Sequence, residues 1–260
     1  MKKDIDIDLI FDRLIACDPL VGQPGIPVYE YKTDIQDLTN EMQRLSIAKA
    51  IVRNNDCLNT EPYFCNDVLM KNISDNPDLI PAWFLTPDGR GPSYNVAELI
   101  ETMLNCKVRI AWTDPAAKNY LLATWCCKEM LSALQQHLIP LLISFKSINI
   151  SDLHNVMADF PKLRIILLDL PRTGQNIMIE ALLKNHPELH LCFSPSFAVH
   201  AGYKNLCSRY GEHRWVWGMG YPESEGGAGI TGLVYSGLTK KQIEAAAFRN
   251  MERLLSEVKI

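Results

Sequence analysis

The feature of this sequence that most constrains its fold is a series of short apolar runs separated by longer segments with helical periodicity. Several runs, such as LIPAWFL at 79–85 and IPLLISF at 139–145, are apolar on successive residues rather than on every second one. A strand has this composition when both of its faces are buried, as in a parallel sheet covered by helices. The pattern therefore predicts an α/β protein in which strands and helices alternate.

Eight runs are predicted to form strands, at residues 7–11, 48–52, 79–85, 108–112, 139–145, 163–170, 189–194 and 214–219. Six helices are predicted between or after them, at residues 37–45, 96–104, 125–138, 151–160, 174–185 and 201–211. Eight such strands with a repeat of about 30 residues indicate a (β/α)8 TIM barrel, whose usual length is about 250 residues. An open doubly wound sheet is the alternative, but no GxGxxG or P-loop motif follows a strand. We predict one barrel domain over residues 1–260.

Two polar segments, 17–36 and 53–78, interrupt this repeat, and each follows a predicted strand. The first is expected to be a long loop, and the second is expected to contain a short helix near residues 66–72. Barrels of this type build their sites at the carboxyl ends of the strands, so we expect function there. After residue 222 the chain is expected to form two closing helices, with Thr239 as the N-cap of the second.

Charge and hydropathy exclude two classes of partner. The chain carries 26 Lys and Arg against 30 Asp and Glu, a net charge of −4, so nucleic acid is not an expected partner. No apolar run approaches the roughly 20 residues of a membrane span. Asp4, Asp6 and Asp8 lie where a signal peptide needs an apolar stretch. We therefore expect a cytoplasmic protein that does not bind a membrane.

The eight cysteines are scattered, with no CxxC pair and no zinc-finger spacing. In a cytosolic protein of this size, buried thiols that pack as small apolar groups are the expected state. Cys57 and Cys65, which lie in the second polar segment, are the candidates for a reactive thiol.

Motifs along the chain point to a known family. The stretch RWVWGMGYP at 214–222 and the later RNMERLL at 249–255 resemble the end of the amidohydrolase-related proteins, a metal-dependent hydrolase superfamily of (β/α)8 barrels. Similarity to the same family continues upstream, at residues 41–52, 76–87, 137–145 and 160–170. The resemblance spans nearly the whole chain in order and implies the same barrel fold.

The metal ligands that this resemblance implies are missing. The family binds one or two divalent metals through an HxH pair on the first strand, a histidine ending each of strands five and six, and an aspartate on strand eight. The matching positions here are Leu14, Ala16, Ser144, Asp169 and Gly220, and residues 1–136 contain no histidine. One carboxylate binds Zn²⁺ or Mg²⁺ too weakly to hold it. We therefore expect no metal and no other cofactor.

Two residues are predicted to act in catalysis. Asp169 ends an apolar run at the expected mouth of the barrel, where a carboxylate can serve as a general base. His200 follows the seventh predicted strand and is the best-placed histidine for acid–base chemistry. A structural role is the alternative for each residue, as an ion-pair partner for Asp169 and as a capping or packing residue for His200.

Five further residues are predicted to contact a substrate: Trp112, Ser144, Ser194, Tyr221 and Glu223. If the family alignment holds, alternation along the fourth strand points Trp112 into the barrel, where it fills the space of the missing metal. Ser144 and Ser194 could orient a ligand by hydrogen bonds, and Tyr221 and Glu223 lie just past the last strand as rim contacts.

Three functions remain open at this point. The first is a hydrolase of the amidohydrolase superfamily that acts on a small carboxylate, lactone or amide, with an atypical or absent metal centre. The second is a catalytically inactive barrel that retains a small-molecule pocket as a sensor or accessory protein. The third is a metal-independent lyase or lactonase that uses Asp169 and His200. Each has a small-molecule ligand as its partner, and the resemblance allows a homodimer, because barrels of this family often dimerise.

Overall fold

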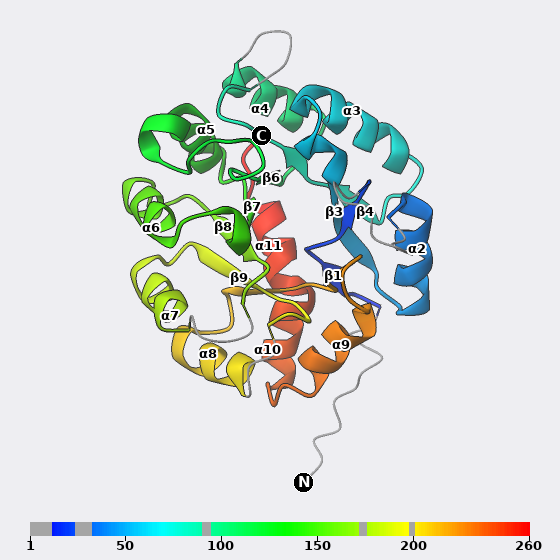
Figure 1. The fold of residues 1–260 in the computed structure, drawn as a ribbon. Coiled ribbons are helices and arrows are strands. Elements are labelled where there is room, and N and C mark those ends of the chain that lie inside the picture. The colour runs from blue at the N-terminus through cyan, green and yellow to red at the C-terminus, as the bar shows by residue number, and fades with distance from the viewer. Residues whose placement is uncertain (1–11, 24–32, 90–94, 172–175, 198–200) are drawn as a thin grey trace.

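The structure is a computed structural model that describes residues 12–23, 33–89, 95–171, 176–197 and 201–260 (Figure 1). The strands are β1 (Ile15–Ala16), β2 (Leu20–Val21), β3 (Lys49–Asn54), β4 (Leu79–Pro81), β5 (Trp83–Phe84), β6 (Ala111–Thr113), β7 (Leu141–Ser144), β8 (Ile165–Leu168), β9 (Leu189–Phe193) and β10 (Trp215–Trp217). Their pairings are parallel, as the apolar runs predict.

The strands form one closed ring with eight positions. β3 pairs with β1, β2 and β4, and a second ladder runs in the order β5–β6–β7–β8–β9–β10. The ladders join on one side at Ala82, between β4 and β5, whose N–H donates to the carbonyl oxygen of Val52 across 2.9 Å. They join on the other side through the N–H of Cys17, which donates to the carbonyl oxygen of Trp217 across 2.9 Å. β1 with β2 and β4 with β5 each fill one position, so the predicted (β/α)8 barrel is confirmed.

Helices lie outside the ring of strands (Figure 1). They are α2 (Ile35–Arg44), α3 (Pro62–Ile73), α4 (Val96–Asn105), α5 (Thr124–His137), α6 (Ile150–Asp159), α7 (Asn176–Asn185), α8 (Gly202–Tyr210) and α9 (Gly226–Val234). Within the described ranges, no helix combines the length and the apolar character needed to cross a membrane.

The chain ends in α10 (Lys240–Glu244), a π-helical turn (Ala245–Arg249) and α11 (Asn250–Ser256). The Asn250 side-chain amide donates to the carbonyl oxygens of Glu212, at 2.8 Å, and Trp215, at 2.7 Å. Both carbonyls lie at the amino end of β10, so this segment packs at the end of the barrel away from the strands' carboxyl ends. The expected N-cap is confirmed, because the Thr239 hydroxyl accepts from the N–H of Gln242 in a capping box.

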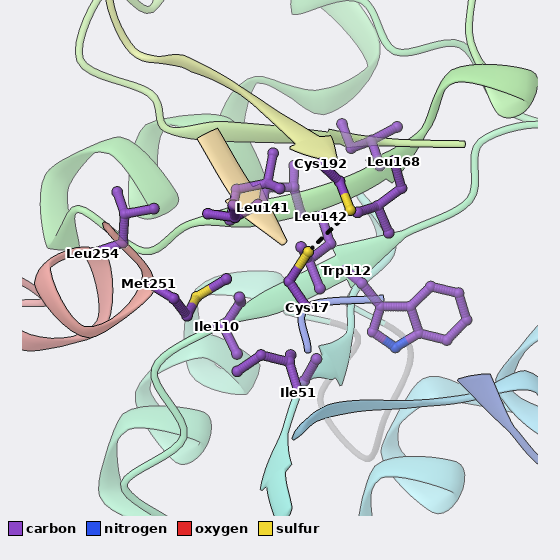
Figure 2. Packing of buried hydrophobic residues seen from close by; sticks show 14 of the residues in the cluster. Cys17, Ile51, Ile110, Trp112, Leu141, Leu142, Leu168, Cys192, Met251 and Leu254 are labelled. Carbon is purple, nitrogen blue, oxygen red and sulfur yellow. Dashed lines mark hydrogen bonds between the residues drawn. The ribbon is translucent and has the colours of Figure 1, made fainter. Parts of the chain in front are cut away.

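Buried side chains fill the interior of the barrel (Figure 2). Ile51, Leu141 and Leu142 are at most 1% exposed. Figure 2 shows the sulfur atoms of Cys17 and Cys192 pointing toward one another, and their Sγ atoms lie 3.2 Å apart. Both thiols are fully buried, and burial raises the pKa of each. They pack as small apolar groups, as expected from the sequence.

The first strand position of the barrel is filled by residues other than those predicted. The predicted strand at residues 7–11 lies outside the described residues, and the ring is filled instead by β1 and β2. The expectation of a loop over 17–36 is therefore wrong at Leu20 and Val21, which pair with Arg53 and Asn54 of β3. Pro19, between the two short strands, has no N–H to donate to a ladder. This break removes the continuous apolar run by which the other strands are recognised.

The second polar segment holds more structure than expected. α3 begins at Pro62, four residues before the expected helix near 66–72, and proline favours this first helical position. Cys57 and Cys65 are joined by a disulfide bond, so the hypothesis that one of them is a reactive thiol is wrong. Structural disulfides are uncommon in the cytosol, so this bond does not fit the reducing environment assumed for the cysteines.

Candidate active site

A cavity of about 380 Å³ opens at the carboxyl ends of the strands. This volume lies within the range of roughly 300–1,000 Å³ that is usual for small-molecule sites. Six predicted site residues line it, namely Trp112, Ser144, Asp169, Ser194, Tyr221 and Glu223. The seventh, His200, lies outside the described residues. The fold therefore brings together six side chains that are spread over more than 100 positions of the sequence.

Asp18 lies between β1 and β2 and lines the cavity, although only 6% of its surface is exposed. Its carboxylate accepts the N–H of Met219 at 2.8 Å and the N–H of Gly220 at 2.9 Å. Burial raises the pKa of Asp18 to about 6, against the lowering effects of Arg53 and the two backbone donors. An acid whose pKa lies this close to neutrality can both donate and accept a proton under physiological conditions.

Arg53, near the end of β3, is a buried cation next to Asp18. It lines the same cavity and is only 7% exposed. Its Nη2 donates to the backbone carbonyl oxygen of Asp18 across 2.6 Å, whereas its buried Nε has no hydrogen-bond partner. Because a guanidinium carries five N–H groups, Arg53 keeps donors that the protein does not use.

Trp112, in β6, points into the barrel as predicted and is 3% exposed. Its ring lies 4.5 Å from that of Phe84, centroid to centroid, and the Cζ atom of Arg53 lies 5.6 Å from its centroid. The buried indole Nε1 has no hydrogen-bond partner. Trp112 therefore gives the cavity a rigid aromatic wall beside the guanidinium.

Asp169 follows β8 directly and is half-buried. Its backbone has a φ of +53°, in the left-handed region that residues other than glycine rarely adopt. Aspartate adopts this conformation more readily than most residues. The turn after β8 places the side chain of Asp169 in the lining of the cavity.

The remaining polar residues of the cavity lie on its wall and at its rim. Ser144 Oγ accepts the N–H of Lys146 at 3.2 Å, and Ser194 Oγ lies 2.8 Å from Ser196 Oγ. At the exposed rim, Lys146 Nζ lies 4.0 Å from a carboxylate oxygen of Glu223. These groups offer hydroxyl hydrogen bonds to a ligand, while the ion pair is open to solvent.

The sequence reasoning misses Asp18 and Arg53. It places the first-strand positions of the family motif on Leu14 and Ala16, which are buried in the core and do not line the cavity. Asp18 and Leu20 are the residues from this part of the chain that line the cavity. Both missed residues are charged and directly follow an apolar stretch, LIAC or AKAIV, and that position could have identified them.

The residues described at the cavity do not fit a divalent metal ion. Asp18 already uses both carboxylate oxygens for backbone N–H groups, and the cationic Arg53 lies beside it. Structural metal sites commonly use four protein ligands and catalytic ones three. Across the described part of the chain, no group of three or more His, Cys, Asp or Glu side chains is placed to hold a metal.

Gly218 supports the position of Asp18. A Cβ atom at residue 218 would lie 2.2 Å from Asp18 Oδ2 and 2.6 Å from Cys192 Sγ. We expect Gly218→Ala to destabilise the protein by about 1–3 kcal/mol, because the buried carboxylate must move. Urea denaturation measures this loss. Gly227→Ala in α9 is the matched control, since its Cβ would meet only Leu45 Cδ2 at 3.9 Å; an equal loss in both variants would contradict the prediction.

Neither a protein-family model nor a curated protein matches this sequence significantly. Solved structures do match its fold. A 5-carboxyvanillate decarboxylase from Novosphingobium aromaticivorans, determined with bound manganese, is 14% identical with a TM-score of 0.74, and the match covers 94% of this chain and 97% of that one. A 2,6-dihydroxybenzoate decarboxylase from Rhizobium is 14% identical with a TM-score of 0.68, over 94% and 99% of the chains.

A third structure, described as an amidohydrolase II, is 12% identical with a TM-score of 0.66, and the match again covers 94% of this chain and 99% of that one. At such low identities the likeness establishes the fold alone. The barrel fold that the sequence resemblance implies is therefore confirmed.

Proposed function

We propose that this barrel is a metal-independent lyase that acts on a small carboxylate bound in the cavity at the carboxyl ends of the strands. The observation that carries the proposal is the buried pair of Asp18 and Arg53, which places a proton donor and a fixed positive charge in one cavity. Two of the similar structures are decarboxylases, which supports a lyase over a hydrolase.

The reaction that fits these groups is loss of a carboxylate as CO2. The bond between the carboxylate carbon and its neighbouring carbon breaks, and its electron pair stays on the neighbouring carbon. Asp18 in its protonated form donates its proton to that carbon and later regains one from solvent. Where a substrate oxygen is conjugated with that carbon, part of the negative charge of the electron pair is delocalised onto the oxygen, and Arg53 stabilises it there.

Asp169 and the serines have positioning roles in this proposal. A half-buried carboxylate at Asp169 accepts a hydrogen bond from a hydroxyl group of the substrate. Ser144 and Ser194 orient its other oxygen atoms, and Trp112 packs against its apolar part. Hydrolysis of a lactone or amide has less support, because it needs an activated water molecule for which the described residues show no metal site.

The test is a turnover screen on chelator-treated protein. Small carboxylates, with 2,6-dihydroxybenzoate and 2-hydroxybenzoate among them, are incubated with the protein, and CO2 and the decarboxylated product are measured. We expect turnover of at least one compound that is unchanged by the chelator. Turnover that depends on added Mn²⁺ would show that the reaction is metal-dependent and the proposal wrong.

A ligand-binding barrel without catalysis is the second candidate. Both carboxylate oxygens of Asp18 accept backbone N–H groups of the segment after β10, which is also what a purely structural carboxylate would do. Saturable binding of carboxylates without any turnover across the screen would favour this candidate.

A further inference from the structure

The cavity at the carboxyl ends of the strands is lined by a buried cation as well as by carboxylates. Four carboxylate residues line the cavity, namely Asp18, Asp114, Asp169 and Glu223, together with the buried guanidinium of Arg53. A divalent cation at this place would be repelled by Arg53 and would compete with backbone N–H groups for Asp18. The positive charge of the cavity is therefore already supplied by the protein.

Arg53 is the one cation among the described cavity residues that is deeply buried. Lys146, the other, has a side chain that is 69% exposed, and it pairs with Glu223 at the rim. The guanidinium lies over the ring of Trp112, with its Nη2 held by the carbonyl oxygen of Asp18. These contacts fix its direction, while its Nε has no partner and the indole Nε1 has none either.

We propose that Arg53 takes the place of a divalent cation in this barrel and binds the anionic oxygen atoms of the ligand. The proposal rests on the proposed function for the choice of a small carboxylate as ligand. Charge-assisted hydrogen bonds from a guanidinium suit a carboxylate in geometry and strength.

Because Asp18 and Arg53 lie side by side, the binding of an anion at Arg53 depends on whether Asp18 carries a proton. When Asp18 is ionised, its charge offsets that of Arg53, and the other carboxylates of the cavity, Asp114, Asp169 and Glu223, add to the repulsion of an incoming anion. Protonation of Asp18 removes the negative charge beside Arg53, so an anion bound at Arg53 then meets less repulsion. An anion held at Arg53 therefore favours the protonated form of Asp18, which is the form that donates a proton in the proposed reaction.

The experiment is calorimetric titration of the purified protein with 2-hydroxybenzoate, and with the uncharged 2-hydroxybenzamide, which has nearly the same size. We expect Arg53→Gln to weaken 2-hydroxybenzoate binding by about 10- to 100-fold and to leave 2-hydroxybenzamide binding within about threefold. Arg209→Gln on the exposed face of α8 is the charge-matched control and should bind both as the wild type does.

Because Arg53→Gln leaves Asp18 without its cation, the double variant Arg53→Gln/Asp18→Asn is titrated as well, after thermal melting shows that it is folded. Equal binding of 2-hydroxybenzoate to the wild type and to both variants would overturn the proposal, as would a wild type that does not bind it at millimolar concentrations. So would stoichiometric binding of Mn²⁺ that Asp169→Asn abolishes.

Binding and turnover separate the two proposals. Binding that depends on Arg53 without turnover of any compound upholds the role of Arg53 and contradicts the lyase. Metal-independent turnover with binding that is unaffected by Arg53→Gln upholds the lyase and overturns the role of Arg53.

Discussion

Asp18→Asn is expected to lower kcat about 10²- to 10⁴-fold on any carboxylate that the protein turns over, because the amide has no acidic proton to donate. Binding should survive, since the side chain keeps its shape and its amide oxygen can still accept one of the backbone N–H groups from Met219 and Gly220. Asp67→Asn, on the exposed face of α3, is the matched control and should keep wild-type turnover. A loss of less than tenfold in Asp18→Asn would remove Asp18 from the reaction.

The pH dependence of turnover tests the same role of Asp18 by a second measurement. If protonated Asp18 is the donor, kcat/KM of the wild type falls as the pH rises through about 6, the pKa to which burial raises Asp18 in the protein without ligand. A profile of kcat/KM that rises through this range would instead indicate that ionised Asp18 acts as a base.

The free energy of unfolding should also depend on the titration of Asp18. The pKa of Asp18 is raised from 3.8 to about 6 in the folded state, so the native protein holds this proton more tightly than the unfolded chain does. The stabilisation is present in full below pH 3.8 and is lost as the pH rises through about 6. The change is about 3 kcal/mol and should be absent from Asp18→Asn. Urea denaturation of both proteins at several pH values measures the difference.

The strands that sequence reasoning locates are those whose burial is continuous. β7 and β8 are buried on both faces by helices and barrel interior, so their apolar runs LLIS and IILL stand out from the polar segments around them. β1 and β2 have two residues each and are separated by a charged residue and a proline, so they leave no such run. β1 and β2 form because they pair with β3, and a contact between separate parts of the chain is not indicated by a local sequence pattern.

The residues of the candidate site also fall into those that the sequence predicts and those that it does not. Trp112, Ser144 and Asp169 were accessible to prediction because each lies at or just after the carboxyl end of a recognisable strand, where barrels place their site residues. Asp18 and Arg53 depend on each other: each is buried beside the other, and β2 and β3 must pair before they meet. The Cys57–Cys65 disulfide likewise depends on how the chain folds between β3 and α3.

Arg214→Met is expected to cost the largest share of stability of any single change considered. Arg214 is 5% exposed and donates to three backbone carbonyl oxygens, those of Leu189 at 2.8 Å, Leu183 at 2.8 Å and His186. Leu183 lies in the last turn of α7 and His186 directly follows the helix, whose last carbonyls have no partner within the helix. Burial lowers the pKa of Arg214 to about 10, and it stays charged at neutral pH.

Methionine fills much of the same volume but donates no hydrogen bond, so three buried carbonyls at the junction of α7, β9 and β10 lose a charged donor. We expect a loss of about 3–5 kcal/mol in the free energy of unfolding, and a Tm lower by about 10 °C for a chain of this size. Arg209→Met, on the neighbouring helix, has a 60% exposed side chain paired with Glu180, and should cost less than about 1 kcal/mol. A loss of similar size in the two variants would mean that water replaces Arg214 at the carbonyls and that the guanidinium does not tie α7 to the sheet.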